Sequence, residues 1–331
     1  MKVAVFGTKS YDRQFFENRG TGRHEKTYLE PRLTPDTVSL AEGHEAVCVF
    51  VHDNVNAEVI DNLKQSGVRY IVIRAAGFNN VDLAAAAKHG LRVARVPAYA
   101  PDGVAEYTVG LILSLNRGIH RAYTRIRNSN FSLDGLMGFN MRGKTVGVIG
   151  TGKIGQSVCQ ILLGFGCRVL AFDVRKQESL MQAGVEYREL EDILPAADIL
   201  TLHVPLLPAT RRMINEETLR KLKNGVMLIN TSRGELIDTG AVIEALKSGR
   251  LSSLGIDVYE EEEGVFFEDL SNAIVDDDRL MRLTTFPNVI LSSHQAFFTR
   301  EAMENIARVT LENLDAFAET GSSPNEVHAQ E

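Results

Sequence analysis

Lys144-Thr-Val-Gly-Val-Ile-Gly-Thr-Gly-Lys-Ile-Gly155 is the stretch that decides how the second half of this chain folds. Apolar residues with strand character run directly into three glycines spaced GxGxxG, which are Gly150, Gly152 and Gly155. An apolar pattern at helical spacing follows, and the next short strand ends at Asp173. A strand, a glycine-rich turn, a helix and an acid about 20 residues further on together predict a dinucleotide-binding unit.

Each residue of this motif has a physical reason to be there. Gly150 permits the tight turn, Gly152 lets the backbone approach a pyrophosphate, and Gly155 lets the helix pack closely on the strand. The positive end of the helix then faces the phosphates. Asp173 would accept hydrogen bonds from the adenosine ribose, and its charge would repel a 2′-phosphate. Arg175 and Lys176 follow and would neutralise only part of that repulsion, so the motif favours NAD over NADP.

Length and composition restrict the class of protein. The 331 residues suffice for two domains, and 44% hydrophobic with 24% charged residues is ordinary for a globular protein. A net charge of −7 argues against a nucleic-acid surface. The three cysteines have no metal-ligand or disulfide spacing, so no metal site and buried thiols are expected. With no long apolar run and no signal-peptide pattern, we expect a soluble cytoplasmic protein without membrane contact.

Apolar strands alternate with helical patterns along the whole chain. Expected strands lie at 3–6, 46–51, 70–73 and 92–96, and then at 145–149, 168–172, 199–202, 226–230, 253–258 and 289–292. Expected helices include 56–65, 81–89 and 239–248. This alternation predicts an α/β protein of two doubly wound parallel-sheet (Rossmann-like) domains with a cleft between them. Ligands in such sheets bind beyond the carboxyl ends of the strands.

The domain boundaries can also be read from the sequence. Pro97-Ala-Tyr-Ala-Pro101 interrupts the pattern, and Asp102 is a candidate N-cap for one long helix from Gly103 to about Ala122. A second long helix, from about Thr299 to Phe317, is expected to return the chain to the first domain. We therefore predict a discontinuous substrate domain of residues 1–100 plus 297–331 and a nucleotide-binding domain of residues 101–296. The polar tail after Gly321 is expected to be loose.

Several chemistry-bearing residues follow predicted strands. One arginine, one histidine and one carboxylate suit hydride transfer to the carbonyl of a 2-oxo acid, because arginine forks onto a carboxylate and histidine can donate a proton. A carboxylate beside the histidine favours its charged form. Position alone does not choose among the candidates, which are Arg233 or Arg74, His294 or His203, and one glutamate of the run Glu260 to Glu263.

A family resemblance narrows these alternatives. The chain resembles the D-isomer-specific 2-hydroxyacid dehydrogenases, in particular the fermentative D-lactate dehydrogenases of bacteria. The matching stretches are Arg74-Ala-Ala-Gly-Phe-Asn-Asn-Val-Asp82, Val96-Pro-Ala-Tyr-Ala-Pro101, Gly150 to Gly155, Asn230-Thr-Ser-Arg-Gly234, Gly255-Ile-Asp-Val-Tyr-Glu-Glu-Glu262 and Ser293-His-Gln-Ala-Phe297. They span most of the chain in the family's order.

The resemblance implies a set of site residues. The catalytic residues would be Arg233, Glu262 and His294, with Glu262 paired to the acid/base His294. The substrate would be bound by Ala76, Gly77, Tyr99 and Arg233. The cofactor contacts would be Gly150, Gly152, Lys153, Ile154, Gly155, Asp173, Val204, Pro205, Thr210, Thr231, Ser232, Arg233 and Asp257. By the same mapping His203 lies beside the cofactor.

The resemblance also implies an activity, which is the reversible NADH-dependent reduction of pyruvate to D-lactate. It further implies a homodimer or homotetramer joined through the helix that starts near Gly103. Two alternatives share the fold: the same chemistry on a bulkier 2-oxo acid, and a nucleotide-sensing binding protein. A methyltransferase is a third, which the complete GxGxxG and the Arg/Glu/His set disfavour.

Overall fold

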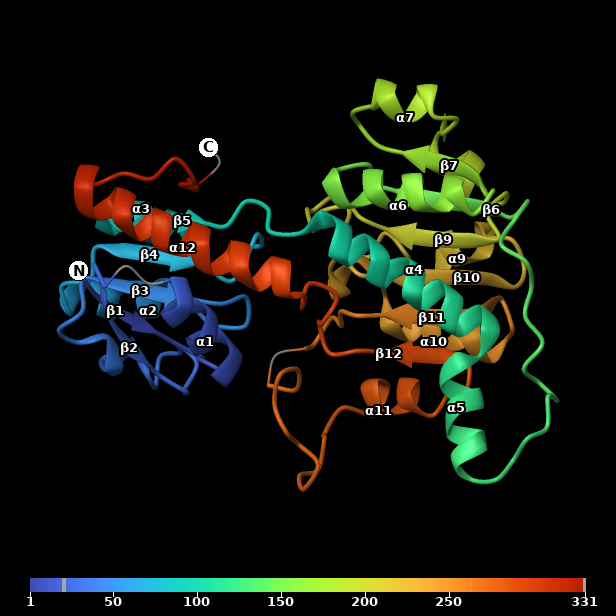
Figure 1. The fold of residues 1–331 in the computed structure, drawn as a ribbon, viewed down its shortest axis with the longest axis horizontal. Helices are drawn as coiled ribbons and strands as arrows, with labels where there is room; N and C mark the ends of the chain where they lie inside the picture. The colour runs from blue at the N-terminus through green and yellow to red at the C-terminus, as the bar shows by residue number, and fades with distance from the viewer. Residues whose placement is uncertain (20–21, 263, 330–331) are drawn as a thin grey trace. The chain divides into compact units, whose positions relative to one another are not determined.

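The chain forms two compact units, each with its own sheet. The computed structural model describes residues 1–19, 22–262 and 264–329. Unit 1 consists of residues 1–100 and 298–331, and unit 2 of residues 101–297. Figure 1 traces the chain through both. The return to unit 1 lies one residue later than the boundary that the sequence suggested. The fold class of two parallel α/β sheets is confirmed.

Unit 1 holds a five-stranded sheet in which every pair is parallel. Its strands are β1 (Lys2–Val5), β2 (Glu25–Tyr28), β3 (Ala46–Val49), β4 (Tyr70–Ile73) and β5 (Arg92–Arg95). Their order is β2-β1-β3-β4-β5, one of the two common doubly wound orders. The sequence analysis missed β2, because its residues Glu-Lys-Thr-Tyr form a half-exposed edge strand without an apolar run.

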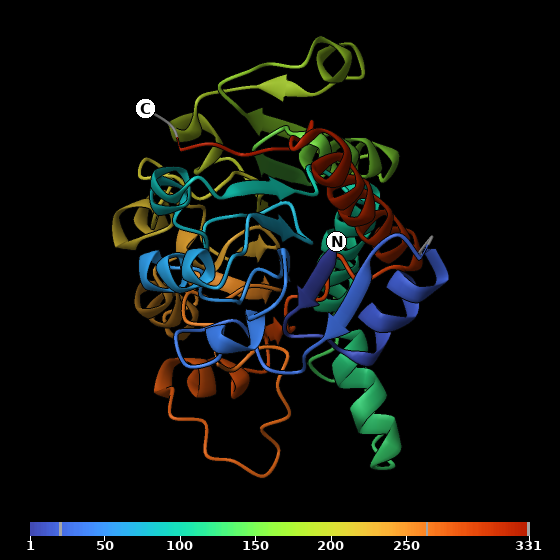
Figure 2. The same cartoon turned by 90° about the vertical axis from the view of Figure 1, so that its left-hand side faces the viewer.

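Helices cover both faces of this sheet. Helices α1 (Ser10–Arg19) and α12 (Arg300–Thr320) pack on one face, where Val3 and Val5 point. Helices α2 (Ala57–Gln65) and α3 (Leu83–His89), with the short η1 (Val38–Ala41), pack on the opposite face (Figures 1 and 2). The ring of Phe317 in α12 stacks on Tyr70 of β4 with centroids 4.6 Å apart. The returning helix is therefore part of the first core.

The tail after α12 is not loose, so that expectation was wrong. Gly321 has a positive φ of 72° and turns the chain back towards β5. Ser323 Oγ then donates to Asn313 Oδ1 at 2.8 Å, and Val327 N–H donates to the carbonyl of Val93 at 2.9 Å. The tail is therefore hydrogen-bonded both to α12 and to the sheet edge.

Unit 2 holds a seven-stranded parallel sheet. Its strands are β6 (Thr145–Ile149), β7 (Arg168–Phe172), β8 (Glu186–Tyr187), β9 (Ile199–Leu202), β10 (Val226–Asn230), β11 (Leu251–Ile256) and β12 (Val289–Leu291). The order β12-β11-β10-β9-β6-β7-β8 reverses direction between β9 and β6, directly beside the glycine-rich turn. Open α/β sheets bind ligands at that switch point.

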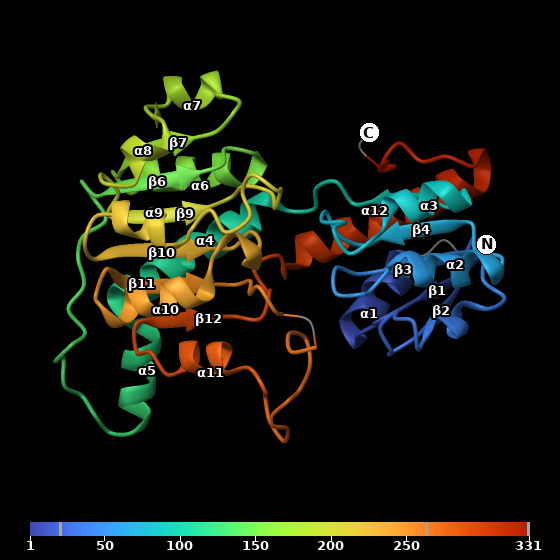
Figure 3. The ribbon, with the colours of Figure 1, turned by 180° about the vertical axis from the view of Figure 1, so that it is seen from behind.

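Two layers of helices enclose the second sheet. Helices α4 (Pro101–Arg117) and α6 (Lys153–Gly164) cover one face, and α7 (Glu178–Gln182) adds Leu180 there. Helices α8 (Leu190–Ile193), α9 (Glu216–Lys221), α10 (Thr239–Lys247) and α11 (Asp278–Thr284) cover the other, as Figure 3 shows from behind. All three cysteines are buried free thiols, as expected.

The long helix expected from Gly103 to Ala122 is two helices. Helix α4 already begins at Pro101, so Asp102 is not its N-cap; the Asp102 carboxylate instead accepts a hydrogen bond from Ser157 Oγ at 2.6 Å. Gly118, with φ of 54°, ends α4 and starts α5 (Ile119–Arg127) in a new direction. Helix α5 extends beyond the sheet of unit 2 (Figures 1 and 3). Among the described residues, no helix is long and apolar enough to cross a membrane.

Candidate active site

The glycine-rich turn after β6 tolerates no side chain at two of its three glycines. Gly150 has φ of 96°, and a Cβ there would lie 2.6 Å from the carbonyl oxygen of His203. A Cβ on Gly155 would lie 2.0 Å from the carbonyl oxygen of Gly150. Gly152 has no atom within 4 Å of its Cβ position, so the space above the turn is open to a ligand. Turn and helix packing therefore require Gly150 and Gly155.

The same turn presents the groups that a dinucleotide needs. Gly152 caps α6 without a side chain, so the first N–H groups of the helix are left for a phosphate. The Asp173 carboxylate lies against the turn, where it accepts hydrogen bonds from Thr151 N–H at 2.5 Å and Arg175 N–H at 2.9 Å. An open glycine, unpaired helix donors and an oriented acid fit the pyrophosphate and ribose of NAD.

Two predicted cofactor contacts, Lys153 and Ile154, are the first residues of α6. Others follow β9, β10 and β11 at the same edge of the sheet, namely Val204, Pro205, Thr210, Thr231, Ser232 and Asp257. Ser232 Oγ donates to the carbonyl of Val204 at 2.6 Å, which joins two of these loops. Thr210 Oγ1 donates to the carbonyl of Pro205 at 2.7 Å. Their contacts with a cofactor stay predictions.

The loop that carries Arg233 is tightly organised. Asn230 donates from Nδ2 to the carbonyl of Arg233 at 2.8 Å and accepts the N–H of Ser232 at 3.0 Å. A Cβ on Gly234 would lie 2.0 Å from the backbone of Tyr259, so the loop touches the segment after β11. The Asn-Thr-Ser-Arg-Gly sequence thus brings Arg233 close to the chain that leads to Glu262.

His294 and Glu262 form an ion pair at the carboxyl ends of β12 and β11. Nδ1 of His294 lies 3.1 Å from Oε1 of Glu262, and the other oxygen of Glu262 accepts the N–H of Tyr259 at 3.3 Å. The His294 side chain is 16% exposed, so its ring remains accessible. Phe267 and Phe297 flank the imidazole, with ring centroids 5.9 and 6.4 Å away.

Asp257 holds the turn that carries His294. Its carbonyl accepts the N–H of His294 at 2.7 Å, and its carboxylate accepts the N–H groups of Gln295 and Ala296 at 2.9 and 2.8 Å. Burial raises the pKa of Asp257, while these hydrogen bonds oppose that shift. The left-handed φ of 49° at His294 is maintained by this network. The sequence analysis missed this supporting role, because nothing in the local pattern reveals a bond across 37 residues.

The remaining glutamates of the acidic run are placed differently. The Glu260 carboxylate lies 3.6 Å from Arg212 and 3.5 Å from Arg279. Glu261 is exposed, and Glu263 lies outside the described residues. Among the described members of the run, only Glu262 contacts a histidine, which agrees with the family mapping.

Of the competing candidates, His203 is half-buried and Arg74 is buried. Desolvation lowers the pKa of His203 to about 3, and its Nε2 lies 2.9 Å from Thr201 Oγ1. A histidine that stays neutral cannot donate the proton at neutral pH. Arg74 donates to the carbonyl of Gly7 at 3.0 Å, and its Nε lies 3.7 Å from Asp12. These contacts give Arg74 a structural place in the core of unit 1.

The residues predicted to bind substrate from unit 1 follow two adjacent strands. Ala76 and Gly77 come after β4, and Tyr99 comes after β5. Arg95, the last residue of β5, donates from Nη1 to the carbonyl of Ala76 at 2.6 Å. The sequence analysis missed Arg95, although its position at a strand end was a usable signal.

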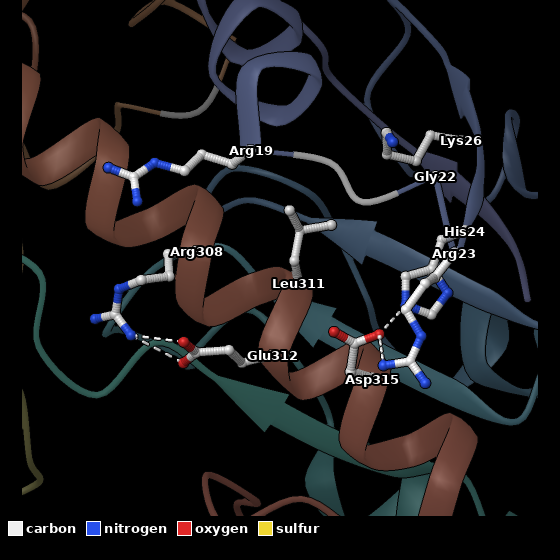
Figure 4. A pocket seen from close by; sticks show the side chains of 9 residues that line it. All are labelled: Arg19, Gly22, Arg23, His24, Lys26, Arg308, Leu311, Glu312 and Asp315. Atoms are coloured by element: carbon white, nitrogen blue, oxygen red, sulfur yellow. Dashed lines mark hydrogen bonds and ion pairs between the residues drawn. The ribbon is translucent and has the colours of Figure 1, made fainter.

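Unit 1 also holds a cavity of about 220 Å³ that none of the predicted site residues lines. Arg19, Arg23, His24, Lys26 and Arg308 line it together with Glu312 and Asp315 (Figure 4). Each of these basic side chains has a carboxylate partner. For example, Nη1 of Arg308 lies 2.7 Å from Oε1 of Glu312, and Nε2 of His24 lies 3.1 Å from Oδ1 of Asp315. These pairs join α12 to α1 and to the residues just before β2.

Comparison with known proteins gives one family. Residues 109–296 match the model of the NAD-binding domain of D-isomer-specific 2-hydroxyacid dehydrogenases. The chain is 49% identical over 329 residues to a D-lactate dehydrogenase of Escherichia coli, covering 99% of this chain and 100% of that one. The apo-structure of an E. coli D-lactate dehydrogenase superposes with a TM-score of 0.89 at 48% identity, with coverage of 99% and 100%.

Two further solved structures bear on the ligands. A D-lactate dehydrogenase from Aquifex aeolicus, complexed with NAD and lactic acid, has a TM-score of 0.88 at 32% identity, covering 99% of this chain and 100% of that one. A D-2-hydroxyisocaproate dehydrogenase has a TM-score of 0.86 at 31% identity with the same coverage. The similarity extends over both units in each case.

Proposed function

The chain belongs to the D-isomer-specific 2-hydroxyacid dehydrogenase family, and from that premise we propose that it reduces pyruvate to D-lactate, reversibly. It is an NAD-dependent enzyme, as the family is. The observation that carries the proposal is the His294–Glu262 pair, 3.1 Å apart, at the same edge of the sheet as the Arg233 loop, which follows β10. An accessible histidine held by a carboxylate is the acid that carbonyl reduction requires.

Proton transfer is the part of the reaction that His294 performs. When bound, NADH supplies the hydride that the carbonyl carbon receives. The hydrogen bond between Nδ1 and Glu262 leaves Nε2 of His294 to give its proton to the carbonyl oxygen. The products are NAD⁺ and the hydroxy acid, and His294 regains its proton from water. Glu262 stabilises the positive charge that His294 must carry beforehand.

Binding of the substrate carboxylate is assigned to Arg233 and to the N–H groups of Ala76 and Gly77. The planar guanidinium matches a carboxylate with two parallel hydrogen bonds, which a lysine cannot reproduce. Tyr99 is assigned to the substrate by its place in the family motif. Gly150 to Gly155 and Asp173 would hold the cofactor, for the reasons of space and charge given above.

The same chemistry on a bulkier 2-oxo acid is the second candidate. It is favoured by the likeness to a D-2-hydroxyisocaproate dehydrogenase, although that protein is 31% identical to this chain and the E. coli D-lactate dehydrogenase is 49% identical. Discrimination of one or two methylene groups by a pocket amounts to about 1–3 kcal/mol each. Pyruvate is therefore the first choice rather than the only substrate.

Assembly and location complete the proposal. Ile119, Tyr123 and Ile126 of α5 are 55, 63 and 57% exposed and share one side of the helix, which supports a homodimer or homotetramer joined through α5. We assign the enzyme to the cytoplasm, where NADH and pyruvate are both available.

The experiment that tests the function is a panel of initial rates. NADH oxidation is measured with pyruvate, 2-oxoisocaproate and phenylpyruvate, and the product is resolved by chiral chromatography. We expect the highest kcat/KM with pyruvate and the D-isomer as product. His294→Asn should lower kcat by about 10²–10⁴-fold without weakening NADH binding, because the acid is lost and the cofactor site is untouched.

Glu262→Gln is the companion variant. It should reduce pyruvate more slowly than the wild type, because the amide does not stabilise the positive charge that His294 carries. A wild-type protein that binds NADH but reduces no member of the panel would contradict the enzymatic proposal and favour a nucleotide-sensing role.

A further inference from the structure

The segment after β4 has its carbonyl groups tied down and its N–H groups free. The carbonyl of Ala75 accepts the N–H of Val96 at 3.1 Å, and that of Ala76 accepts Nη1 of Arg95 at 2.6 Å. Within the described part of the chain, the N–H groups of Ala76 and Gly77 donate to no protein atom. Native backbone donors without a protein partner are left for water or a ligand.

Peptide geometry links these two observations. In a planar trans peptide the C=O and N–H groups point in opposite directions. The bond to the Ala75 carbonyl therefore orients the Ala76 N–H, and the bond to the Ala76 carbonyl orients the Gly77 N–H. The first bond comes from the backbone of the neighbouring segment. The second depends on one side chain, that of Arg95.

The Arg95 side chain is itself well held. Its guanidinium lies over the ring of Phe78, 5.0 Å from the centroid. Its backbone N–H donates to the carbonyl of Asn325 at 3.1 Å, and its carbonyl accepts Asn313 Nδ2 at 3.0 Å. Arg95 is thus fixed from the C-terminal tail, from α12 and from the loop that it supports. The guanidinium is partly withdrawn from water, and this partial burial lowers the pKa of Arg95.

We propose that Arg95 is a positioning residue that aims the Gly77 N–H at the carboxylate of the 2-oxo acid. The proposal rests on the proposed function, in which Ala76 and Gly77 bind that carboxylate. Arg95 acts through the peptide, because its Nη1 is occupied by the Ala76 carbonyl. Without the Arg95 side chain, the peptide between Ala76 and Gly77 is free to rotate. A fraction of the enzyme molecules would then lack the hydrogen bond from the Gly77 N–H to the substrate carboxylate.

The test compares Arg95→Met with Arg95→Lys. Methionine fills much of the same space but has no donor, and lysine keeps a donor that can reach the carbonyl. The KM for pyruvate should rise about tenfold or more in Arg95→Met, and lysine should restore part of the loss. NADH affinity, measured by fluorescence titration, should be unchanged in both. The dissociation constant of oxamate, an isostere of pyruvate, from the enzyme–NADH complex should rise with KM.

Arg92→Met is the matched control, since Arg92 lies on the same strand and pairs with Glu326 at 2.8 Å, away from the loop. It should lower the unfolding temperature without changing KM. Phe78→Leu removes the ring beneath Arg95 and should raise KM by a smaller factor, which tests the idea even if Arg95→Met folds poorly.

Two negative outcomes have different meanings. Wild-type KM and oxamate affinity in Arg95→Met and Phe78→Leu would overturn the positioning role and leave the enzymatic function standing. A wild-type enzyme inactive on every 2-oxo acid would overturn the function itself.

Discussion

The carboxylate of Asp173 is held in place before any ligand arrives, because each of its two oxygens accepts a hydrogen bond from a backbone N–H group, one from Thr151 and one from Arg175. An NADP 2′-phosphate would meet this fixed charge. NADH should therefore be preferred over NADPH by at least about tenfold in kcat/KM, or roughly 1.4 kcal/mol. Asp173→Ser should reduce that preference, as measured by steady-state kinetics with both cofactors.

Glu178→Ser is the control for Asp173, because it removes an exposed acid from the same unit without touching the turn. It should keep the NADH preference. Equal efficiency with both cofactors in the wild type would mean that Arg175 and Lys176 outweigh the aspartate.

Single residues show where sequence reasoning reaches its limit. His294 and His203 both follow apolar strands, so position could not separate them. In the structure the two rings have different partners, since the His203 ring contacts Thr201 and the His294 ring contacts Glu262. Which partner each ring contacts depends on packing between segments far apart in the chain. Only the family motif supplied that information in advance.

Among the elements, the buried strands were predicted best. Strands β4, β6, β7, β9 and β10 have the predicted bounds, because a parallel sheet covered on both faces gives continuous apolar runs. Edge strands β2 and β8 are polar and carry no such signal. The break at Gly118 was missed because the apolar pattern continues across it. A glycine within such a pattern does not by itself indicate a positive φ.

Helix α5 offers the clearest test at this scale. Its exposed residues Ile119, Tyr123 and Ile126 would be covered by a second copy in the proposed dimer. Tyr123→Glu combined with Ile126→Glu should shift the protein towards monomer at micromolar concentration, because charges do not stay buried unpaired in an interface. Sedimentation velocity measures the change.

Thr124→Glu is the control variant for α5, since it also adds a negative charge but on the other side of the helix. It should leave the assembly intact. A wild-type enzyme that sediments as an active monomer would remove the basis for the α5 interface.

For the whole molecule, stability should depend on pH through His203. Burial lowers the pKa of His203 from 6.5 to about 3. Between these two pH values the histidine is protonated in the unfolded state but stays neutral in the folded state. Stability is thus complete above pH 6.5 and falls as the pH drops towards 3, by at most about 1.4 kcal/mol per pH unit from this group. In urea titrations from pH 7 to 5, His203→Gln should show a shallower decline than the wild type. Parallel declines in the two proteins would contradict this origin.

The discontinuity of unit 1 has a consequence for biosynthesis. Leu314 and Phe317 cover Tyr70 and Val72 of the first sheet, yet they follow its last strand, β5, by more than 200 residues of chain. At about 5–20 residues per second, the part of that face that α1 does not cover stays open for on the order of ten to forty seconds. The nucleotide-binding unit, whose residues are contiguous, can fold in that interval. The domain that is translated first is therefore the one completed last, and its uncovered strands are where a nascent chain would meet chaperones.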